Sequence, residues 1–272
     1  MKTSTNKAQI AYILIITGES VLNLVWGAAD ARRAAALEII ARTAYTAEES
    51  ACHFLETIGL DTDGKIRETL ELARWQDTNE QMHEDVFGRD LGGLDSWFDQ
   101  FLSRHVAFVI YWVFAIVTLI DHEFAALLGE AVEVEAVKTY GRMLRDAPEE
   151  FLEQPATRGA LEYWAKPNTL WSERDERLPE TMRDVVEFIR RDEADHIENN
   201  SKKATAFWYK MNNSDTAFVS IISIANVLIC IGIALAGVGE GFGISDEQSE
   251  LDYTSEVVRT ASDFTGYLGT GL

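Results

Sequence analysis

The chain of 272 residues contains little proline, little cysteine and little positive charge. Its four prolines all fall between residues 148 and 179, so the long runs on either side can form uninterrupted helices. Cys52 and Cys230 lie far apart and outside any CxxC spacing, which argues against a disulfide framework and a thiolate metal site. Lys and Arg number 24 against 45 Asp and Glu, and this net charge of −21 argues against a nucleic-acid partner.

A persistent alternating strand pattern is also absent, and helical periodicity dominates. The stretch 148–178, which holds the prolines, is expected to be a long loop with short helical pieces. The sequence therefore predicts an all-α protein. The expected helices lie near residues 8–28, 31–58, 65–86, 95–128, 129–147, 178–212 and 216–238.

Three apolar stretches indicate contact with a membrane. Residues 216–239 carry no charge and are long enough to span a bilayer, although a buried core helix is the alternative. Lysines precede this stretch and acids follow it, so the positive-inside rule places the main body on the cytoplasmic side. Residues 106–120 are too short to span and are expected to lie partly in one leaflet. The N-terminal helix within residues 1–30 is a third membrane-contacting candidate, and the acidic tail 240–272 is expected to be disordered.

Two short motifs carry the chemistry: Glu80 precedes His83 by three residues, and Glu193 precedes His196 by three. Positions i and i+3 share one face of a helix, so each pair can offer a carboxylate and an imidazole to one metal ion. Two such pairs, with one further glutamate from each of two other helices, form the ligand set of a ferritin-like four-helix di-iron bundle. The spacing alone is weak evidence, because the chain is rich in acids. The other histidines, His53, His105 and His122, lack the pattern and are interpreted as surface or packing residues.

The two remaining glutamates have several candidates. Glu38 and Glu133 are embedded among apolar residues, where a carboxylate is costly unless it is compensated. Glu130 and Glu135 share the setting of Glu133. The other acids of helix 31–58 are Glu48 and Glu49, interpreted as surface residues, and Glu56 beside a polar turn.

Six segments together resemble the alternative oxidases, and among them the plastid-type terminal oxidases. The resemblance runs from about Leu22 to Asn199, with the motifs in the family's order. The segments are Arg32–Tyr45 (RRAAALEIIARTAY), His53–Gly59 (HFLETIG), Asn79–His83 (NEQMH), Leu91–Phe101 (LGGLDSWFDQF) followed by Tyr111-Trp112, Glu133–Tyr140 (EVEAVKTY) and Arg190–His196 (RRDEADH).

The resemblance assigns a role to each matching position. It implies that two iron ions are held by Glu38, Glu80, His83, Glu133, Glu193 and His196, and its spacing selects Glu38 over Glu56. It implies that Asn79 and Asp192 orient the ligands and that Tyr140 is a redox-active catalytic residue. It implies a quinol pocket lined by Arg33, Leu37, Glu135 and Thr139, for which ordinary packing and surface roles are the alternative. Ala44 stands where the family usually has proline, which puts a helix bend there in doubt.

The implied activity is oxidation of ubiquinol or plastoquinol coupled to reduction of O2 to water, insensitive to cyanide and without proton pumping. The implied partners are the quinol, O2, the lipid bilayer and a second copy of the chain in a homodimer. The expected domains are the N-terminal helix 1–30, the di-iron bundle 31–212, the anchor 216–239 and the tail 240–272. Three other hypotheses stay open: a di-iron hydroxylase, a ferritin-like iron handler, and a metal-free acidic scaffold on the membrane.

Overall fold

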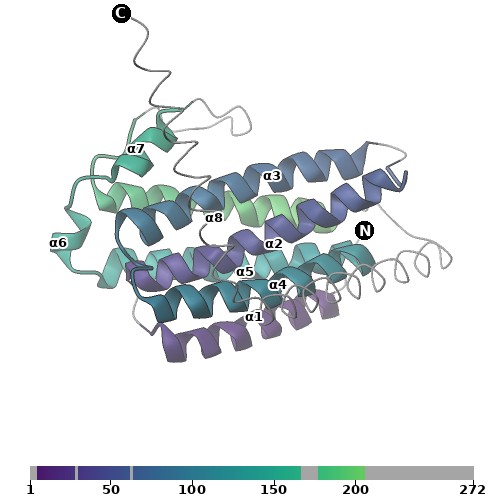
Figure 1. Cartoon of the computed structure of the whole chain (residues 1–272), viewed down its shortest axis with the longest axis horizontal. Helices are drawn as coiled ribbons and strands as arrows, with labels where there is room; N and C mark the ends of the chain where they lie inside the picture. Colours follow the sequence, from purple (N-terminus) through teal and green to yellow (C-terminus); the bar gives the residue numbers. More distant parts are fainter. Residues whose placement is uncertain (1–4, 28–29, 62–63, 167–176, 206–272) are drawn as a thin grey trace, which may run out of the picture. The chain divides into compact units, whose positions relative to one another are not determined.

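The long helices of the chain lie side by side as a bundle (Figure 1). The structure is a computed structural model that describes residues 5–27, 30–61, 64–166 and 177–205, all within one compact unit, Met1–Val219. In these ranges no β-strand occurs, and Pro155 and Thr181 form only an isolated bridge. The predicted all-α class is confirmed. The helices are α1 (Thr5–Val25), α2 (Ala31–Thr57), α3 (Lys65–Glu84), the π-helix η1 (Asp85–Asp90), α4 (Trp97–Ile120), α5 (His122–Asp146), α6 (Glu149–Leu152), α7 (Arg158–Trp164) and α8 (Met182–Thr205).

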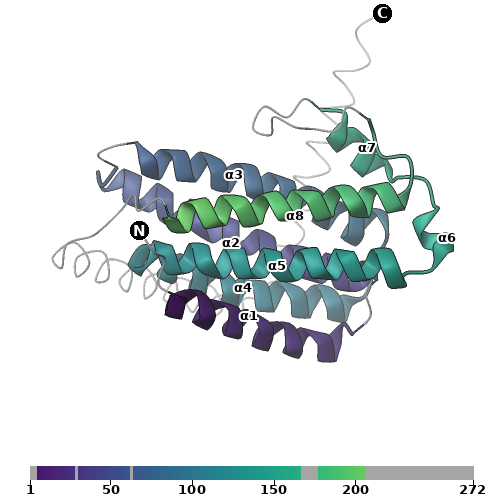
Figure 2. The same cartoon turned by 180° about the vertical axis from the view of Figure 1, so that it is seen from behind.

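Four helices, α2, α3, α5 and α8, form the bundle that holds the predicted site. α2 packs along α3 and α5 packs along α8, while α4 covers α2 and α1 covers α5 (Figures 1 and 2). α2 has three consecutive, fully buried alanines at 34, 35 and 36, whose small side chains let neighbouring helices approach closely on several sides. Residues from all four helices meet in one buried cluster that includes Met82, Phe87, Tyr140 and Ile189.

The ends of α2 follow from its flanking residues. Asp30 precedes the helix and its side chain accepts the backbone N–H of Arg33 at 3.0 Å, which satisfies one of the free donors of the first turn. Gly59, just beyond the helix, has a φ of +78°, the left-handed conformation that commonly ends helices. α2 runs without interruption through Ala44, so Glu38 and Tyr45 lie two turns apart on one continuous helix.

The boundary between the two central helices differs from the prediction of helices 95–128 and 129–147. α4 ends at Ile120 and α5 begins at His122. The side chain of Asp121 accepts the N–H of Phe124 at 3.1 Å and caps α5. Helical apolar periodicity continues on both sides of Asp121, so the pattern hid a break that the capping residue marks. α4 has 24 residues and is longer than the apolar stretch 106–120. The prediction of a helix too short to span a bilayer rested on that stretch alone.

The segments around the bundle agree only in part with the sequence. The stretch 148–178 does contain two short helices, α6 and α7, as predicted. The predicted helix 65–86 continues as the π-helix η1, a distortion often found near functional sites. The predicted anchor 216–239 and tail 240–272 lie outside the described residues.

Candidate metal centre

Six side chains from the four bundle helices meet in the interior. Glu38 comes from α2, Glu80 and His83 from α3, Glu133 from α5, and Glu193 and His196 from α8. All six are buried, with at most 2% of each residue exposed. The i, i+3 spacing within α3 and α8 puts each glutamate and histidine on the same face, as expected from the sequence.

The six residues form two overlapping groups that could each hold a metal ion. One group is Glu38, Glu80, His83 and Glu193; the other is Glu80, Glu133, Glu193 and His196. Within each group the potential ligand atoms lie within 4.8 Å of one another. Glu80 and Glu193 belong to both groups, so their two carboxylate oxygens can each face a different ion. This arrangement has the form of two adjacent metal sites with two bridging carboxylates.

The distances show how the imidazoles face the shared carboxylates. His83 Nδ1 lies 3.1 Å from Glu193 Oε1 and 3.7 Å from Glu80 Oε2. His196 Nδ1 lies 2.9 Å from Glu80 Oε1 and 3.4 Å from Glu193 Oε2. Each histidine therefore presents the same ring nitrogen to both shared glutamates, as a ligand of a common centre would.

Many polar atoms of the cluster lack a hydrogen-bond partner among the described residues. They include both carboxylate oxygens of Glu80 and Glu193, one oxygen each of Glu38 and Glu133, and Nδ1 of both histidines. Burial and the nearby Glu80 and Glu193 charges raise the pKa of Glu38 well above its usual range. Burial and the same two carboxylates also raise the pKa of Glu133. Four buried carboxylates that face only two imidazoles are costly, and bound cations remove that cost, so the residues fit a pair of metal ions.

A hydrogen-bonded group lies behind His83 of the candidate centre. Asn79 donates from Nδ2 to Asp192 at 2.9 Å and to the hydroxyl of Tyr163 at 2.7 Å. Asp192 Oδ2 lies 3.4 Å from Nε2 of His83, the ring nitrogen that faces away from the centre. The structure thus brings the two predicted orienting residues, Asn79 and Asp192, behind His83, as the partners of metal-binding histidines usually lie. Tyr163, which lies in α7, was not singled out, because a tyrosine in a predicted loop carries no distinctive signal.

A second supporting group lies behind the α5 ligand and was also missed. Tyr45 donates its hydroxyl to Glu133 and accepts a hydrogen bond from Asn200 Nδ2 at 3.1 Å. Burial and the charges of Glu133 and Glu80 raise the pKa of Tyr45 well above its usual range, which keeps it a hydrogen-bond donor. Helical spacing is the signal that could have found it: Tyr45 lies seven residues after Glu38, on the same face of α2.

Tyr140 lies on the face of α5 that carries Glu133, two turns further along. It is buried, and its hydroxyl has no hydrogen-bond partner among the described side chains. Its ring stacks on Phe87, with centroids 5.7 Å apart, and Phe87 follows His83 by one helical turn. The structure therefore places Tyr140 in the aromatic packing next to the cluster.

Comparison with known proteins agrees with this geometry. Residues 3–205 match the family described as alternative oxidase. The chain belongs to the alternative oxidase family. It is also similar to a protein of Arabidopsis thaliana described as ubiquinol oxidase 4, chloroplastic/chromoplastic, with 32% identity over 169 residues. That match covers 59% of the chain and 47% of the relative, so the chain spans about half the length of the curated relative it matches. The prediction of an alternative oxidase is confirmed, and the similarity to a chloroplast relative agrees with the plastid-type resemblance.

Three of the four residues predicted for the quinol pocket, Arg33, Glu135 and Thr139, meet at the contact of α1, α2 and α5. Buried Arg33 donates to Glu19 of α1 at 3.0 Å, and Arg142 of α5 donates to the same carboxylate at 2.8 Å and to Thr139 at 3.0 Å. Glu135 accepts from Lys138 and also faces Glu19. Leu37 follows Arg33 by one turn of α2 and is partly buried.

Glu19 and Arg142 were missing from the predicted pocket. Glu19 was recognised only as an interruption in the apolar stretch 10–26. A lone acid within an apolar helix is a usable signal, because it needs a buried cationic partner. Arg142 follows Thr139 by three residues and so shares its face of α5.

Glu48 corrects a prediction, because it is buried rather than on the surface. Its carboxylate accepts hydrogen bonds from Lys203 Nζ at 2.5 Å and from His122 Nε2 at 3.0 Å. Lys203 also donates to the buried Gln76 at 2.8 Å. The neighbouring Glu49 does bind a surface arginine, Arg74. The pair Glu48-Glu49 looked solvated because the cation that compensates Glu48 comes from α8, 155 residues away.

Glu56 lies apart from the cluster. It pairs with Arg67, an exposed arginine at the beginning of α3. It therefore links the ends of α2 and α3, consistent with its interpretation as a helix-end residue.

Proposed function

We propose that this protein is a membrane-bound di-iron quinol oxidase that oxidises ubiquinol or plastoquinol and reduces O2 to water. The observation that carries the proposal is the pair of Glu/His groups joined by Glu80 and Glu193 in a chain of the alternative oxidase family. The name of the Arabidopsis relative supports a quinol as the reductant.

The ligand set fits two iron ions. Glu38 and His83 would hold one ion, Glu133 and His196 the other, with Glu80 and Glu193 between them. When bound, the iron pair supplies the redox chemistry of O2 reduction. Asp192 holds His83 from behind and Tyr45 holds Glu133, so both terminal ligands keep their orientation. Tyr140 is proposed as the redox-active tyrosine, because it is buried next to the proposed ligands and its hydroxyl forms no hydrogen bond with the described residues.

The polar cluster of Arg33, Glu19, Arg142, Glu135 and Thr139 is proposed as the quinol head-group site. It combines two guanidinium donors with two carboxylates at a contact between α1 and the bundle. Burial raises the pKa of Glu135, Lys138 opposes the shift, and Glu19 adds to it. Glu135 is therefore suited to accept a proton from a quinol hydroxyl. We propose that the reaction moves no protons across the membrane.

The outer faces of α1 and α4 support association with a lipid bilayer. Residues Asn6–Val25 and Trp97–Ile120 are long and apolar enough to cross a membrane. In the apolar 18-residue window of each helix, only 6% and 28% of the residues, respectively, are buried. Low burial argues against both being ordinary core helices. A peripheral membrane face would bring lipid-dissolved quinol to the cluster on α1. The exposed apolar residues are Ile10, Tyr12, Ile13, Leu14, Ile16 and Leu24 on α1, and Trp97, Phe98, Phe101, Phe108, Val109, Val113, Ile116 and Ile120 on α4.

Four further parts of the proposal rest on the sequence alone. They are the bundle boundaries 31–212, the anchor 216–239, the cytoplasmic side for the catalytic body and the homodimer. The exposed apolar faces favour a quinol oxidase over a ferritin-like iron handler, which has no need of a lipid-dissolved reductant.

The test is O2 uptake by the purified, iron-loaded protein in lipid with ubiquinol or plastoquinol as sole reductant. We expect cyanide-insensitive uptake with a quinone as product. Glu19→Gln is expected to raise the KM for quinol by about tenfold, since it removes a charged partner of Arg33 and Arg142, while the iron content stays unchanged. Asp146→Asn, an exposed change at the end of α5, is the matched control. Iron-loaded protein that takes up no O2 with either quinol would contradict the proposal.

A further inference from the structure

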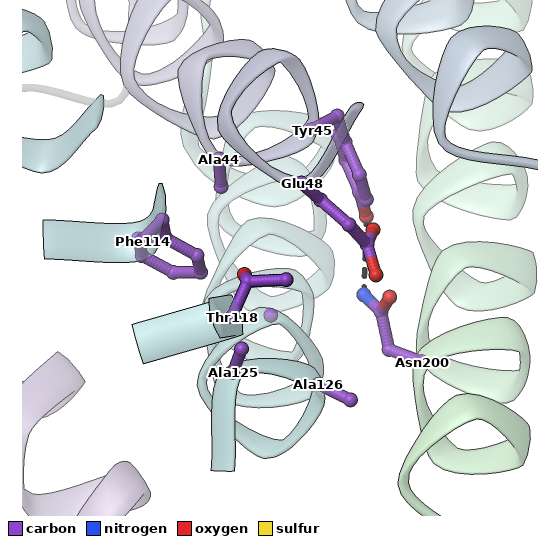
Figure 3. Close-up of a pocket in the computed structure, with 9 residues that line it drawn as sticks. Ala44, Tyr45, Glu48, Phe114, Thr118, Ala125, Ala126 and Asn200 are labelled. Carbon is purple, nitrogen blue, oxygen red and sulfur yellow. Dashed lines mark hydrogen bonds between the residues drawn. The ribbon is translucent and has the colours of Figure 1, made fainter. Parts of the chain in front are cut away.

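A small pocket lies among α2, α4, α5 and α8, close to the metal centre (Figure 3). Its free volume is about 10 Å³, room for one molecule about the size of water. Most of its wall is small and apolar, with Phe114 and Thr118 contributed by α4. The lining residues are Ala44, Tyr45, Glu48, Phe114, Thr118, Ala125, Ala126, Gly129 and Asn200.

The pocket reaches the metal centre through Tyr45. The hydroxyl of Tyr45 donates to Glu133, one of the proposed ligands. Asn200 donates to the same hydroxyl (Figure 3). The ring of Tyr45 also stands edge-on to His196, with centroids 5.5 Å apart. A small molecule in the pocket would thus be one side chain away from two of the proposed ligands.

The pocket and the proposed quinol site lie on opposite sides of the centre along the bundle. On α5, Gly129 of the pocket precedes Glu133, whereas Thr139 of the quinol site follows it. A helix rises 1.5 Å per residue, so the ten residues from Gly129 to Thr139 separate the two sites by about 15 Å. On α2 the order agrees, because Arg33 precedes Glu38 and Ala44 follows it.

One polar group in the pocket wall, the hydroxyl of Thr118, is buried and forms no hydrogen bond with the described residues. Other helical threonines here, such as Thr43 and Thr57, bond to the carbonyl four residues earlier. A buried hydroxyl without a partner calls for an explanation, and a small molecule in the pocket would supply one.

We propose that this pocket admits dioxygen, so that the two substrates reach the centre from opposite sides. The inference rests on the proposed oxidase function. The volume is too small for a quinol ring. The wall is largely apolar, and its one carboxylate, Glu48, is already paired with Lys203 and His122, so the pocket suits a small neutral molecule that the Thr118 hydroxyl can weakly contact. Dioxygen partitions into lipid in preference to water, and α4 turns exposed Val113 and Ile116 outward while Phe114 and Thr118 line the pocket.

The first experiment asks what occupies the pocket. Crystals of the full chain are pressurised with xenon, an apolar probe of dioxygen sites, and the gas is located by its anomalous signal. We expect xenon between Phe114 and Ala126. An ordered water on Thr118 that xenon does not displace would overturn the proposal, and so would an empty pocket under xenon.

The second experiment narrows the pocket with one methyl group. A Cβ added at Gly129 would lie 3.0 Å from Asn200 Nδ2, closer than ordinary contact. Gly129→Ala is expected to raise the KM for O2 at least about threefold, because overpacking a filled site costs binding energy, while the KM for quinol stays unchanged. Ala126→Val, about one turn earlier on the same face of α5, is the second variant should Gly129→Ala fail to fold.

Gly141→Ala is the matched control. It lies on the same helix and gains the same helix propensity, but its added Cβ would meet only Arg145 at 3.8 Å. It should leave both KM values unchanged. If the wild type consumes O2 with quinol but the narrowing variants change only kcat, or change both KM values equally, the dioxygen route is wrong while the oxidase stands. If the wild type consumes no O2 with quinol, the proposed function itself fails.

Discussion

Two buried charged regions lie in the same bundle, and their carboxylates are compensated in different ways. Glu48 has its counter-charge within the chain, since Lys203 and His122 bond to it and Gln76 holds Lys203. The four glutamates of the metal centre have only two imidazoles, and most of their oxygens lack partners among the described residues. Burial of an acid therefore does not by itself indicate a metal site. Buried carboxylate oxygens that no cation of the chain compensates are the stronger indication of a metal site.

The largest expected effect comes from removing a shared carboxylate. Glu80→Gln should lower iron affinity by more than about a hundredfold, since even supporting residues of metal sites contribute 10- to 100-fold. Metal analysis after dialysis and O2 uptake measure the effect. Glu71→Gln, an exposed change on the same helix, should alter neither. Equal iron contents in the two variants would place the metal elsewhere.

Removing the charge of Glu48 should lower the stability of the fold without changing the affinity for iron. Glu48→Gln leaves Lys203 buried without its counter-charge, so the free energy of unfolding should fall by about 3 kcal/mol. Denaturant unfolding of metal-free protein measures it. The neighbouring Glu49→Gln removes only a surface pair with Arg74 and should cost less than about 1 kcal/mol. If the two changes cost the same, Glu48 is not a buried ion-pair partner.

The same region predicts a window of acid sensitivity. Burial alone would raise the pKa of Glu48, but Lys203 and His122 outweigh it and lower the pKa from 4.5 to about 2. A lowered pKa gives stability that is fully present above pH 4.5 and lost as the pH falls towards 2. The difference in unfolding free energy between wild type and Glu48→Gln should therefore shrink across this window. A difference that stays constant from pH 7 to pH 2 would contradict the assignment.

The smallest effect is expected at Glu38 in metal-free protein. Because burial and neighbouring charges raise the pKa of Glu38, glutamine resembles its protonated form. Glu38→Gln should change the unfolding free energy of metal-free protein by less than about 1 kcal/mol, yet reduce the stabilisation gained on adding iron. Thermal unfolding with and without Fe(II) tests both parts. A loss as large as that of Glu48→Gln would mean that Glu38 is paired like Glu48.

Local spacing in the sequence predicted the parts of the site that share a helix. Glu80 with His83 and Glu193 with His196 follow directly from three-residue spacing, and the family motifs supplied Glu38 and Glu133. The all-α class followed from periodicity. The break at Asp121 was missed because apolar periodicity continues across it and only the cap marks it.

Partners from distant helices were beyond local pattern. Lys203 compensates Glu48 across 155 residues, and Asn200 reaches Tyr45 over the same separation. Glu19 and Arg142 meet only because α1 packs on α5. Such pairs depend on which helix faces match, and a single sequence does not state this.

Anaerobic titration of the metal-free wild-type chain with Fe(II), followed by thermal unfolding, tests the central claim most directly. A di-iron centre at these six residues predicts about two tightly bound Fe(II) per chain and a higher unfolding temperature. Glu193→Ala should abolish both effects. Fewer than about two Fe(II) per chain, or binding unchanged by Glu193→Ala, would contradict it.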